Sequence, residues 1–250
     1  MIVIKNSEQL KLMKEAGRIT GEALLVAEDA IREGMSTKEL DTVIRNYIEK
    51  CGAKPSFLGY GGFPGSACIS INDEVIHGIP SPKRIIKAGD IVKVDVGALY
   101  RGYNGDAART FAVGSVSEEA KRLIEATKES FYKGAALALA GNRIGDIGYA
   151  VQSCVEGHGF SVVREYIGHG VGAKLHEEPD VPNYGTSGRG PRLYAGMTIA
   201  IEPMVNAGVE KVKVLGDGWT VVTADGSLSA HYENTVAVTE DGPVLLTDVR

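Results

Sequence analysis

The sequence predicts an α+β fold made of two related halves, residues 1–113 and 114–250, joined in a single domain. Two observations lead to this prediction. Two helical segments are followed by strands, and the same order then occurs a second time. In addition, a constant shift along the chain superposes residues of the first half on residues of the second. We expect the two halves to bring side chains together at a shared site.

The first half opens with two helices that the sequence marks clearly. Asn6 followed by Gln9 predicts the N-terminus of the first, and Gly34 predicts a stop after it. Its buried face is predicted by apolar or small residues at every third or fourth position: Leu10, Met13, Gly17, Thr20, Leu24, Ala27 and Ile31. Ser36 and Glu39 form a capping box that predicts the start of the second helix.

Strands and a second pair of helices follow. Residues 57–82 are rich in Gly and Pro and predict loops around short strands. Residues 91–96 and 106–113 predict two strands, joined by a turn near Gly102 and Gly105. Further helices are predicted from Ser117 to about Ala135 and from Asp146 to about Val155. The remainder, from Ser161, alternates short strands with turns.

The repeat has an offset of 107 residues. This shift places Gly34 on Gly141, Gly52 on Gly159 and Gly61 on Gly168, and it matches a run of further small and aliphatic positions. It also places Asp95 on Glu202. We interpret the repeat as two homologous halves related by an approximate two-fold axis, with acidic side chains converging from both.

Composition and charge narrow the class of protein. The chain has 250 residues, 44% hydrophobic and 24% charged, and a net charge of −5. Clustered cations, which phosphate binding requires, are missing, so we expect no nucleic-acid site. The sequence shows neither a signal peptide nor a long apolar stretch, and its three cysteines are an odd number. We therefore expect a cytoplasmic protein with reduced cysteines and no membrane segment.

Three carboxylates occupy unusual places. Asp95 lies within V-D-V-G, Glu202 within I-A-I-E-P, and Glu233 within S-A-H-Y-E-N-T-V-A-V. Acidic residues are depleted in strands, and a buried carboxylate is costly unless it is paired or bound to metal. Each alone fits a salt-bridged or strand-edge acid. Together they need a common explanation, and a bound cation is the simplest.

The histidines support this interpretation. His77, His169 and His176 are flanked by Gly, Pro or acidic residues in segments that predict loops. His158 ends a predicted helix and is expected to cap it, whereas His231 shares a strand face with Glu233 and is either a partner of the site or a surface residue. Carboxylates with one histidine and no cysteine suit Mn, Fe, Co or Zn. Bridging carboxylates can hold two such ions about 3.5–4 Å apart and activate a shared water.

A set of motifs then resembles type I methionine aminopeptidases of the pita-bread fold. The likeness runs from about residue 3 to residue 246, and the motifs occur in the family's order. They are S-I-N-D-E-V-I-H-G-I-P (70–80), K-V-D-V-G (93–97), G-D-A-A-R-T (105–110), Y-I-G-H-G-V-G (166–172), L-H-E-E-P-x-V-P-N-Y (175–184), G-M-T-I-A-I-E-P (196–203), D-G-W-T (217–220) and H-Y-E-N-T (231–235).

The resemblance implies a role for each matching residue. Five would hold two divalent ions: Asp95 one ion, His169 and Glu202 the other, and Asp106 and Glu233 both. His77 and His176 resemble the family's substrate-contacting histidines. A monovalent cation (Na or K) would bind backbone carbonyls near Asn72, Glu74 and Ser229.

The implied reaction is hydrolysis of the first peptide bond, which removes the initiator methionine when the second residue is small. A metal-activated hydroxide would attack the carbonyl, Glu202 would shuttle a proton, and His77 and His176 would stabilise the intermediate. The methionine side chain would lie in an apolar pocket of Tyr60, Cys68 and Trp219, with Phe63 and Leu175. Phe57, Phe63 and Leu175 stand where the family often has Cys, Tyr and Phe, so the shape of the pocket stays open.

The resemblance also implies the partners of the protein, and it leaves other members of the fold family as alternative assignments. We expect a monomer that acts on nascent polypeptides at the ribosome, and the native metal stays open. Aminopeptidase P and prolidase share the fold but carry an additional N-terminal domain, whereas here a helix is predicted from about residue 7. Type II methionine aminopeptidases insert a helical subdomain between the positions of His169 and Glu202. A binding protein with a decayed metal site would have lost ligand positions, and all five are present.

Overall fold

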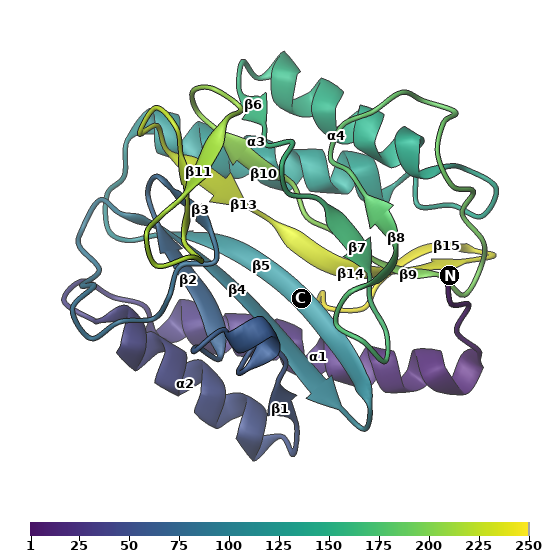
Figure 1. Ribbon diagram of the computed structural model, residues 1–250, viewed down its shortest axis with the longest axis horizontal. Coiled ribbons are helices and arrows are strands. Elements are labelled where there is room, and N and C mark those ends of the chain that lie inside the picture. Colours follow the sequence, from purple (N-terminus) through teal and green to yellow (C-terminus); the bar gives the residue numbers. More distant parts are fainter. Residues whose placement is uncertain (250) are drawn as a thin grey trace.

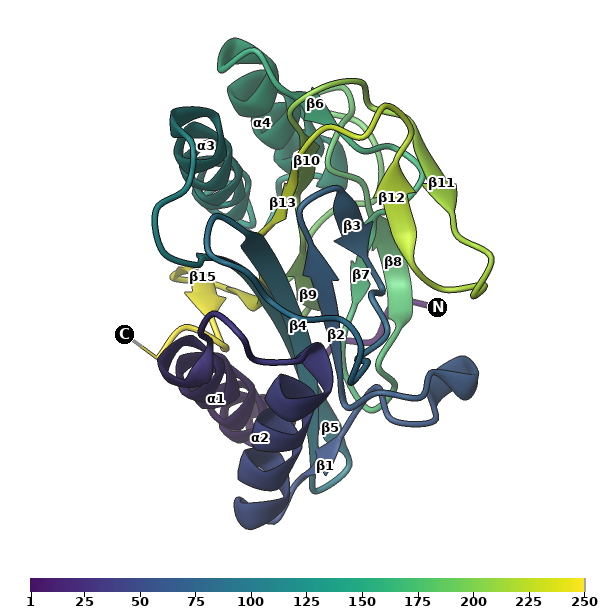
Figure 2. The same ribbon diagram turned by 90° about the vertical axis from the view of Figure 1, so that its left-hand side faces the viewer.

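The computed structural model describes residues 1–249 and contains four α-helices and fifteen strands among them. The helices are α1 (Ser7–Ala30), α2 (Thr37–Lys50), α3 (Glu118–Ala135) and α4 (Ile144–Gly157). In Figure 2 all four helices lie on one side of the curved main sheet, and the short strands β3, β11 and β12 lie on the other. The prediction of an α+β fold is confirmed.

The predicted helix starts are confirmed at three of the four helices. Asn6 and Gln9 form a reciprocal capping box at α1, Ser36 and Glu39 form another at α2, and Ser117 accepts from the Ala120 N–H at α3. These caps satisfy backbone donors that the first turn of a helix leaves without partners. The fourth helix begins at Ile144, two residues before the predicted Asp146. The first helix ends at Ala30, a few residues before Gly34.

The main sheet has nine strands, and its central order is β1-β4-β5-β14-β9-β7-β8. In addition, β2 pairs with β4 and β15 pairs with β14. The bounds are β1 (Lys54–Pro55), β2 (Ala67–Ile71), β4 (Ile91–Tyr100), β5 (Tyr103–Ala112), β7 (Gly168–Gly170), β8 (Glu177–Val181), β9 (Thr198–Ile201), β14 (Glu233–Thr239) and β15 (Gly242–Leu245).

Two smaller sheets complete the fold. One has the order β13-β10-β6 and the other the order β11-β12-β3. Their strands are β3 (Glu74–Ile76), β6 (Ser161–Val162), β10 (Met204–Asn206), β11 (Val212–Val214), β12 (Val221–Thr223) and β13 (Ser229–His231), and a short 3-10 helix, η1, spans Tyr60–Gly62. Short strands were predicted in both regions that contain these elements.

The turn between β4 and β5 differs from the prediction. It lies at Arg101 and Gly102, whereas Gly105 belongs to β5 and pairs with Ala98. The physical reason for a glycine at position 105 is packing. A Cβ there would lie 2.8 Å from the Cα of Gly17 in α1, so the two glycines let the helix and the strand approach closely.

The hydrophobic core follows the two pairs of helices. The first pair packs its apolar faces against β2, β4 and β5, through residues such as Ile19, Leu40 and Val94. The second pair covers β9, β14 and the β13-β10-β6 sheet. Figure 1 shows α1 and α2 at one end of the sheet and α3 and α4 at the other, with β5 and β14 between them. The helices of the described chain are all too short or too polar to cross a membrane.

Candidate metal centre and active site

A cavity of about 860 Å³ is lined by residues of β2, β4, β5, β7, β8 and β14 and by loops of both halves. All residues that the resemblance assigned to the divalent ions, to substrate contacts or to the methionine pocket line this cavity. These residues are Asp95, Asp106, His169, Glu202, Glu233, His77, His176, Tyr60, Phe63, Cys68, Trp219 and Leu175.

Strand register places the acidic side chains next to one another. Cys68 of β2 pairs with Asp95 of β4, Asp95 pairs with Ala108 of β5, and Ala108 pairs with Glu233 of β14. Directly paired residues project from the same face of a sheet. Asp106 lies two residues before Ala108 and therefore projects from that face too. Three neighbouring strands thus deliver three carboxylates to one surface of the sheet.

The second half of the chain adds His169 and Glu202. His169 lies in β7 and Glu202 directly follows β9, and these two strands are neighbours in the sheet. The Nε2 atom of His169 lies 3.5 Å from Glu202 Oε1 and 3.7 Å from Asp106 Oδ2. The side-chain amide of Asn183 donates to the Glu202 carbonyl at 3.0 Å and fixes that backbone. The imidazole therefore faces carboxylates from both halves.

The hydrogen bond of His169 fixes which ring nitrogen is available. Its Nδ1 lies 2.8 Å from the carbonyl oxygen of Gly170. A carbonyl oxygen can only accept, so Nδ1 carries the proton. Burial lowers the pKa of His169 to about 3, which keeps the ring neutral at physiological pH. The lone pair of Nε2 therefore points at Asp106 and Glu202, as it must in a metal ligand.

The carboxylates show the electrostatic signature of a cation site. One oxygen each of Asp95, Asp106 and Glu233 is buried without a hydrogen-bond partner. Burial raises the pKa of Asp95 to about 7, and burial together with neighbouring carboxylates raises the pKa values of Asp106, Glu202 and Glu233 well above their usual range. Buried, mutually repelling carboxylates are costly, and a bound divalent ion relieves both desolvation and repulsion.

Ligand atoms approach closely enough for a shared ion at two places. One group is Asp106, His169 and Glu233, and the other is Asp95, His231 and Glu233. Within each group the atoms lie within 4.8 Å of one another. Glu233 belongs to both groups and has two oxygens, as a bridging carboxylate requires. Oxygen and imidazole donors suit the divalent ions that the sequence indicated, so the residues fit such a metal.

Glu233 is held in place by a buried arginine that the sequence did not single out. Arg109 of β5 donates to the Glu233 carbonyl at 2.5 Å and to the side-chain oxygen of Asn234 at 2.7 Å. Its guanidinium also lies 4.1 Å from the centre of the Tyr232 ring. A planar guanidinium that makes several hydrogen bonds restricts the backbone at Glu233 and thus the direction of its carboxylate.

His231 is the second residue whose importance the sequence left open. Its side chain is 1% exposed, which removes the surface alternative and leaves a partner of the site. Its Nε2 atom lies 3.7 Å from Glu233 Oε2, and neither ring nitrogen has a hydrogen-bond partner. The hydroxyl of Thr110 donates to the His231 carbonyl at 2.8 Å and accepts from the His231 N–H at 2.9 Å, so the backbone is fixed.

The other end of the cavity is apolar. Phe57, Phe63, Cys68 and Leu175 form a buried cluster against which Trp219 packs. The rings of Phe63 and Trp219 meet edge to face, with centres 5.1 Å apart. Burial and the nearby carboxylate of Asp95 raise the pKa of the Cys68 thiol well above its usual range, so it stays neutral. Cys68 is therefore an apolar wall residue here.

The two remaining histidines lie between the acidic and the apolar ends. His77 has a left-handed backbone (φ +58°), and its ring faces Tyr166 and Trp219 edge to face. Burial lowers its pKa to about 4, so the ring is neutral. The Nδ1 atom of His176 lies 2.7 Å from the Tyr60 hydroxyl, and its ring centre lies 4.0 Å from that of His169. The His176 ring thus borders the ligand cluster, and the His77 ring lies beside Trp219 in the same cavity.

A buried lysine lies where the resemblance implied a monovalent cation. The Nζ atom of Lys93 donates to the carbonyls of Asn72 at 2.7 Å and Ser229 at 3.0 Å. An ion bound by these carbonyls would have to displace that group. Lys93 stands out in the sequence as a cation within the aliphatic strand I-V-K-V-D-V, and this signal was available but not used.

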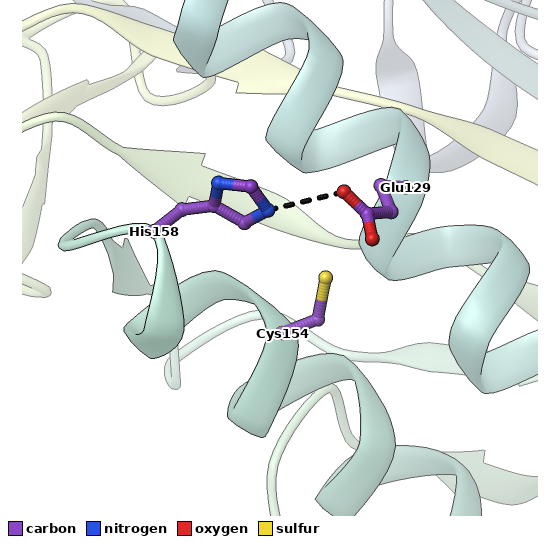
Figure 3. Close-up of side chains that lie close together, drawn as sticks. All are labelled: Glu129, Cys154 and His158. Atoms are coloured by element: carbon purple, nitrogen blue, oxygen red, sulfur yellow. Dashed lines mark hydrogen bonds and ion pairs between the residues drawn. The ribbon is translucent and has the colours of Figure 1, made fainter.

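A third group of possible ligands lies away from the cavity, on the outer helices (Figure 3). Glu129 of α3 and Cys154 of α4 lie there with His158, which is the C-cap residue of α4 as the sequence predicted. The Nε2 atom of His158 lies 3.1 Å from Glu129 Oε2, and both side chains are nearly half exposed. The exposure and the existing ion pair describe a solvated helix cap.

Comparison with known proteins agrees with this geometry. A model of metallopeptidase family M24 matches residues 11–240. The chain belongs to metallopeptidase family M24. Among its curated relatives, the methionine aminopeptidase of Clostridium acetobutylicum is 56% identical over 247 residues, with 99% of each chain covered. Methionine aminopeptidase 1 of Bacillus subtilis is 52% identical over 249 residues, with both chains covered completely.

Solved structures of M24 peptidases show the same fold. The crystal structure of methionine aminopeptidase from Thermotoga maritima matches with a TM-score of 0.98 at 46% identity, covering 99% of this chain and 100% of that one. The prolidase from Pyrococcus furiosus matches with a TM-score of 0.80 at 27% identity, and only 66% of its chain is covered. These neighbours confirm the pita-bread fold, and the partial coverage of the prolidase agrees with the larger architecture expected of that rival.

Proposed function

We propose that this protein is a metal-dependent aminopeptidase that removes the N-terminal methionine from polypeptides whose second residue is small. The observation that carries the proposal is the construction of the cavity. Buried carboxylates and a neutral histidine form one end, and an apolar pocket lies beside them. High identity to methionine aminopeptidases over the whole chain supports the same activity.

Two divalent ions would be held by the residues that the register brings together. We assign Asp95 to one ion, His169 and Glu202 to the other, and Asp106 and Glu233 to both. The place of Glu233 in both groups of ligand atoms supports its bridging role, and the bridging role of Asp106 rests on the resemblance. Divalent ions bound there would lower the pKa of a water molecule and polarise a peptide carbonyl. Co, Mn, Fe and Zn all suit the donor set.

The protein's own side chains would then position the peptide and move protons. The Glu202 carboxylate lies 3.5 Å from His169 Nε2 in the ligand cluster, a position suited to accepting a proton and passing it to the leaving amine. If the Tyr60 hydroxyl donates to His176 Nδ1, the opposite nitrogen carries a proton that can be donated to a developing oxyanion. His77 borders the same space from β3 and the loop after it, and its neutral ring is a donor without a charge to desolvate.

The apolar end of the cavity fits a methionine side chain. The thioether is flexible and polarizable and makes favourable contacts with aromatic rings. Phe63 and Trp219 supply such rings, and Cys68 and Leu175 close the wall. Phe57 belongs to the same buried cluster and also lines the cavity, so we expect an unbranched apolar side chain of the size of methionine to be preferred.

Peptide hydrolysis with three substrates tests this function. The metal-reconstituted protein should release methionine from Met-Ala-Ser and leave Met-Lys-Ser intact, because a large second residue is excluded. Mass spectrometry of the products separates the outcomes. Cleavage of an Xaa-Pro peptide in place of Met-Ala-Ser would move the assignment to the prolidase and aminopeptidase P branch of the family, whose members share the fold.

The setting of the reaction follows from the resemblance alone. We propose that the protein acts as a monomer in the cytoplasm on nascent chains as they leave the ribosome. Size-exclusion chromatography with light scattering and co-sedimentation with ribosomes check these two statements. A stable dimer would refute the first, and failure to co-sediment at low ionic strength would refute the second.

A further inference from the structure

Lys93 is an unusual residue for the interior of a sheet. It belongs to β4, is only 1% exposed, and ranks among the largest fully buried side chains. Burying an ammonium is expensive unless oxygen atoms replace the water that it loses. The identity of those oxygen atoms therefore indicates what the side chain does.

The ligands of Lys93 are main-chain carbonyls from distant parts of the chain. Asn72 lies in the turn between β2 and β3, with a left-handed backbone (φ +56°), and Ser229 begins β13. The Asn72 carbonyl also accepts from the Ser229 N–H at 3.0 Å, so the two segments meet at the lysine. Converging neutral carbonyls are the kind of shell that proteins provide for alkali-metal ions.

The nearby carboxylates do not replace these carbonyls as partners. Glu74 binds the Ile71 N–H at 2.6 Å and Arg84 at 2.9 Å. Glu74 favours the charged form of Lys93 from a distance, together with Asp73 and Asp90, while Arg84 opposes it. Burial lowers the pKa of Lys93 to about 7, so the side chain is a cation mainly below neutral pH. Lys93 is therefore held through backbone oxygens within a surrounding acidic field, unlike a lysine in an ordinary buried salt bridge such as Lys5 with Glu177.

The place of this contact links it to the proposed metal centre. Lys93 is two residues before Asp95 and projects from the same face of β4. Ser229 is two residues before His231 and four before Glu233. The Lys93 ammonium therefore joins β4 to the β2–β3 turn and to β13, and so joins a ligand-bearing strand of the first half to the segment that leads to Glu233.

We propose that the Lys93 side chain is a tethered internal cation that takes the place of an exchangeable monovalent ion between β4, the β2–β3 turn and β13. The protein then needs neither Na nor K to order His231 and Glu233 against Asp95. Lys93 acts as a positioning residue, because its contacts are with backbone and it does not line the cavity. The inference deepens the proposed function by assigning how one side of its metal centre is held.

Thermal unfolding in different salts tests the proposal on the full-length protein without substrate or divalent metal. Samples in tetramethylammonium, sodium, potassium and ammonium chloride are compared at equal ionic strength, because tetramethylammonium is too large for the carbonyl site. We expect the wild-type Tm to be the same in all four salts. We expect Lys93→Ala to lose roughly 5 °C in tetramethylammonium chloride and to regain at least half of this loss, saturably, in potassium or ammonium chloride.

A matched control separates this rescue from general destabilisation. Val94→Ala removes buried atoms from the neighbouring position of the same strand, on its opposite face. Its Tm should fall without any dependence on the monovalent cation. If Lys93→Ala does not fold in any of the salts, Lys93→Gln is measured in the same way and judged by the same criteria.

Cobalt binding supplies a readout at the metal centre itself. In tetramethylammonium chloride, Lys93→Ala should bind Co²⁺ about tenfold more weakly than the wild type, followed by visible absorption, and potassium should restore the affinity. A wild-type Tm that rises specifically with potassium or sodium would overturn the proposal. So would a Lys93 variant that unfolds at the same temperature in every salt. Neither result depends on the peptide assay, so a failure of the Lys93 proposal can be distinguished from a failure of the proposed function.

Discussion

At the scale of single residues, the site is defined by which atoms are left without partners. Asp95, Asp106 and Glu233 each bury an oxygen that no described group satisfies, and His169 presents its Nε2 lone pair to two carboxylates. Burying such groups costs free energy in the metal-free protein, and a bound cation lowers that cost. The same reasoning distinguishes Cys68, whose neutral thiol belongs to the apolar wall, from a metal ligand.

Trp219 offers a residue-scale test of the pocket. Trp219→Ala should raise KM for Met-Ala-Ser about tenfold and change kcat less, because the lost contact is with the bound side chain and not with the reacting carbonyl. Steady-state kinetics measures both constants. Tyr149→Ala, which truncates a half-exposed aromatic residue on α4, serves as the control and should leave KM unchanged. An unchanged KM in the Trp219 variant would remove it from the pocket.

At the scale of elements, features set by local sequence could be predicted, and features set by tertiary packing could not. The capping pairs at Asn6 and Ser36 and the cap at Ser117 are short-range patterns, and the helices begin where these patterns indicate. The long strands β4 and β5 were predictable from their β-branched and apolar residues. Gly105 was wrongly predicted to lie in a turn, because a glycine is needed there for close contact with Gly17, which is 88 positions away in the sequence.

The candidate site shows the same division. The ligand positions could be chosen from the sequence because acids in aliphatic strands are conspicuous, and the resemblance added Asp106. The residues that hold those ligands in place could not be chosen from the sequence. Arg109 looks like an ordinary surface cation until β5 and β14 are paired, and the burial of His231 and Lys93 depends on short strands that have little local signal. The order of strands in the sheet was not predicted at all.

Close packing of α1 on β5 gives a prediction at this scale. Gly105→Ala should lower the free energy of unfolding by about 1–3 kcal/mol, because its Cβ would lie only 2.8 Å from the Gly17 backbone and 2.8 Å from Thr20 Oγ1. Since Asp106 is the next residue, divalent-metal affinity should fall as well. Urea unfolding and metal titration measure the two effects.

Gly157→Ala is the corresponding control. This glycine ends α4, and a Cβ there would meet open space. Its free energy of unfolding should stay the same or rise slightly, because alanine is the better helix residue. If Gly105→Ala were as stable as this control, close contact between α1 and β5 would not be important for the fold.

At the scale of the whole molecule, the sheet joins two parts of the chain around one cavity. The order β4-β5-β14-β9 places a pair of strands from the first part beside a pair from the second, and the shift of 107 residues relates β4 to β9. The division at residue 113 and the single domain spanning residues 1–250 stay predictions, and residue 250 lies outside the described chain.

The buried carboxylates predict how the stability of the metal-free protein depends on pH. Their pKa values are raised in the folded state, to about 7 for Asp95 and well above the usual range for Asp106, Glu202 and Glu233. A raised folded pKa contributes stability that is complete below the unfolded value of about 4 and is lost as pH rises through the folded value. The Tm of metal-free protein should therefore fall between about pH 6.5 and pH 8.5.

Other buried groups do not reverse this trend in that range. The buried histidines have lowered pKa values, so they change the stability mainly below their unfolded pKa of about 6.5. Lys93, whose pKa is also lowered, adds stability as pH rises, but it is one group against four carboxylates. Added Mn²⁺ should raise the Tm more at pH 8.5 than at pH 6.5, because it must displace fewer protons. Scanning calorimetry measures this difference, and a metal-free Tm that rises steadily over the range would contradict it.

The central claim is that divalent metal held by this cluster performs the removal of methionine. Metal content and methionine release from Met-Ala-Ser, measured on the same samples of wild type and Asp106→Asn, test it most directly. Asp106 is 3% exposed and belongs to the ligand group that includes His169 and Glu233. We expect the variant to keep its circular dichroism spectrum but to lose bound metal and nearly all turnover. A folded variant with wild-type activity would contradict it.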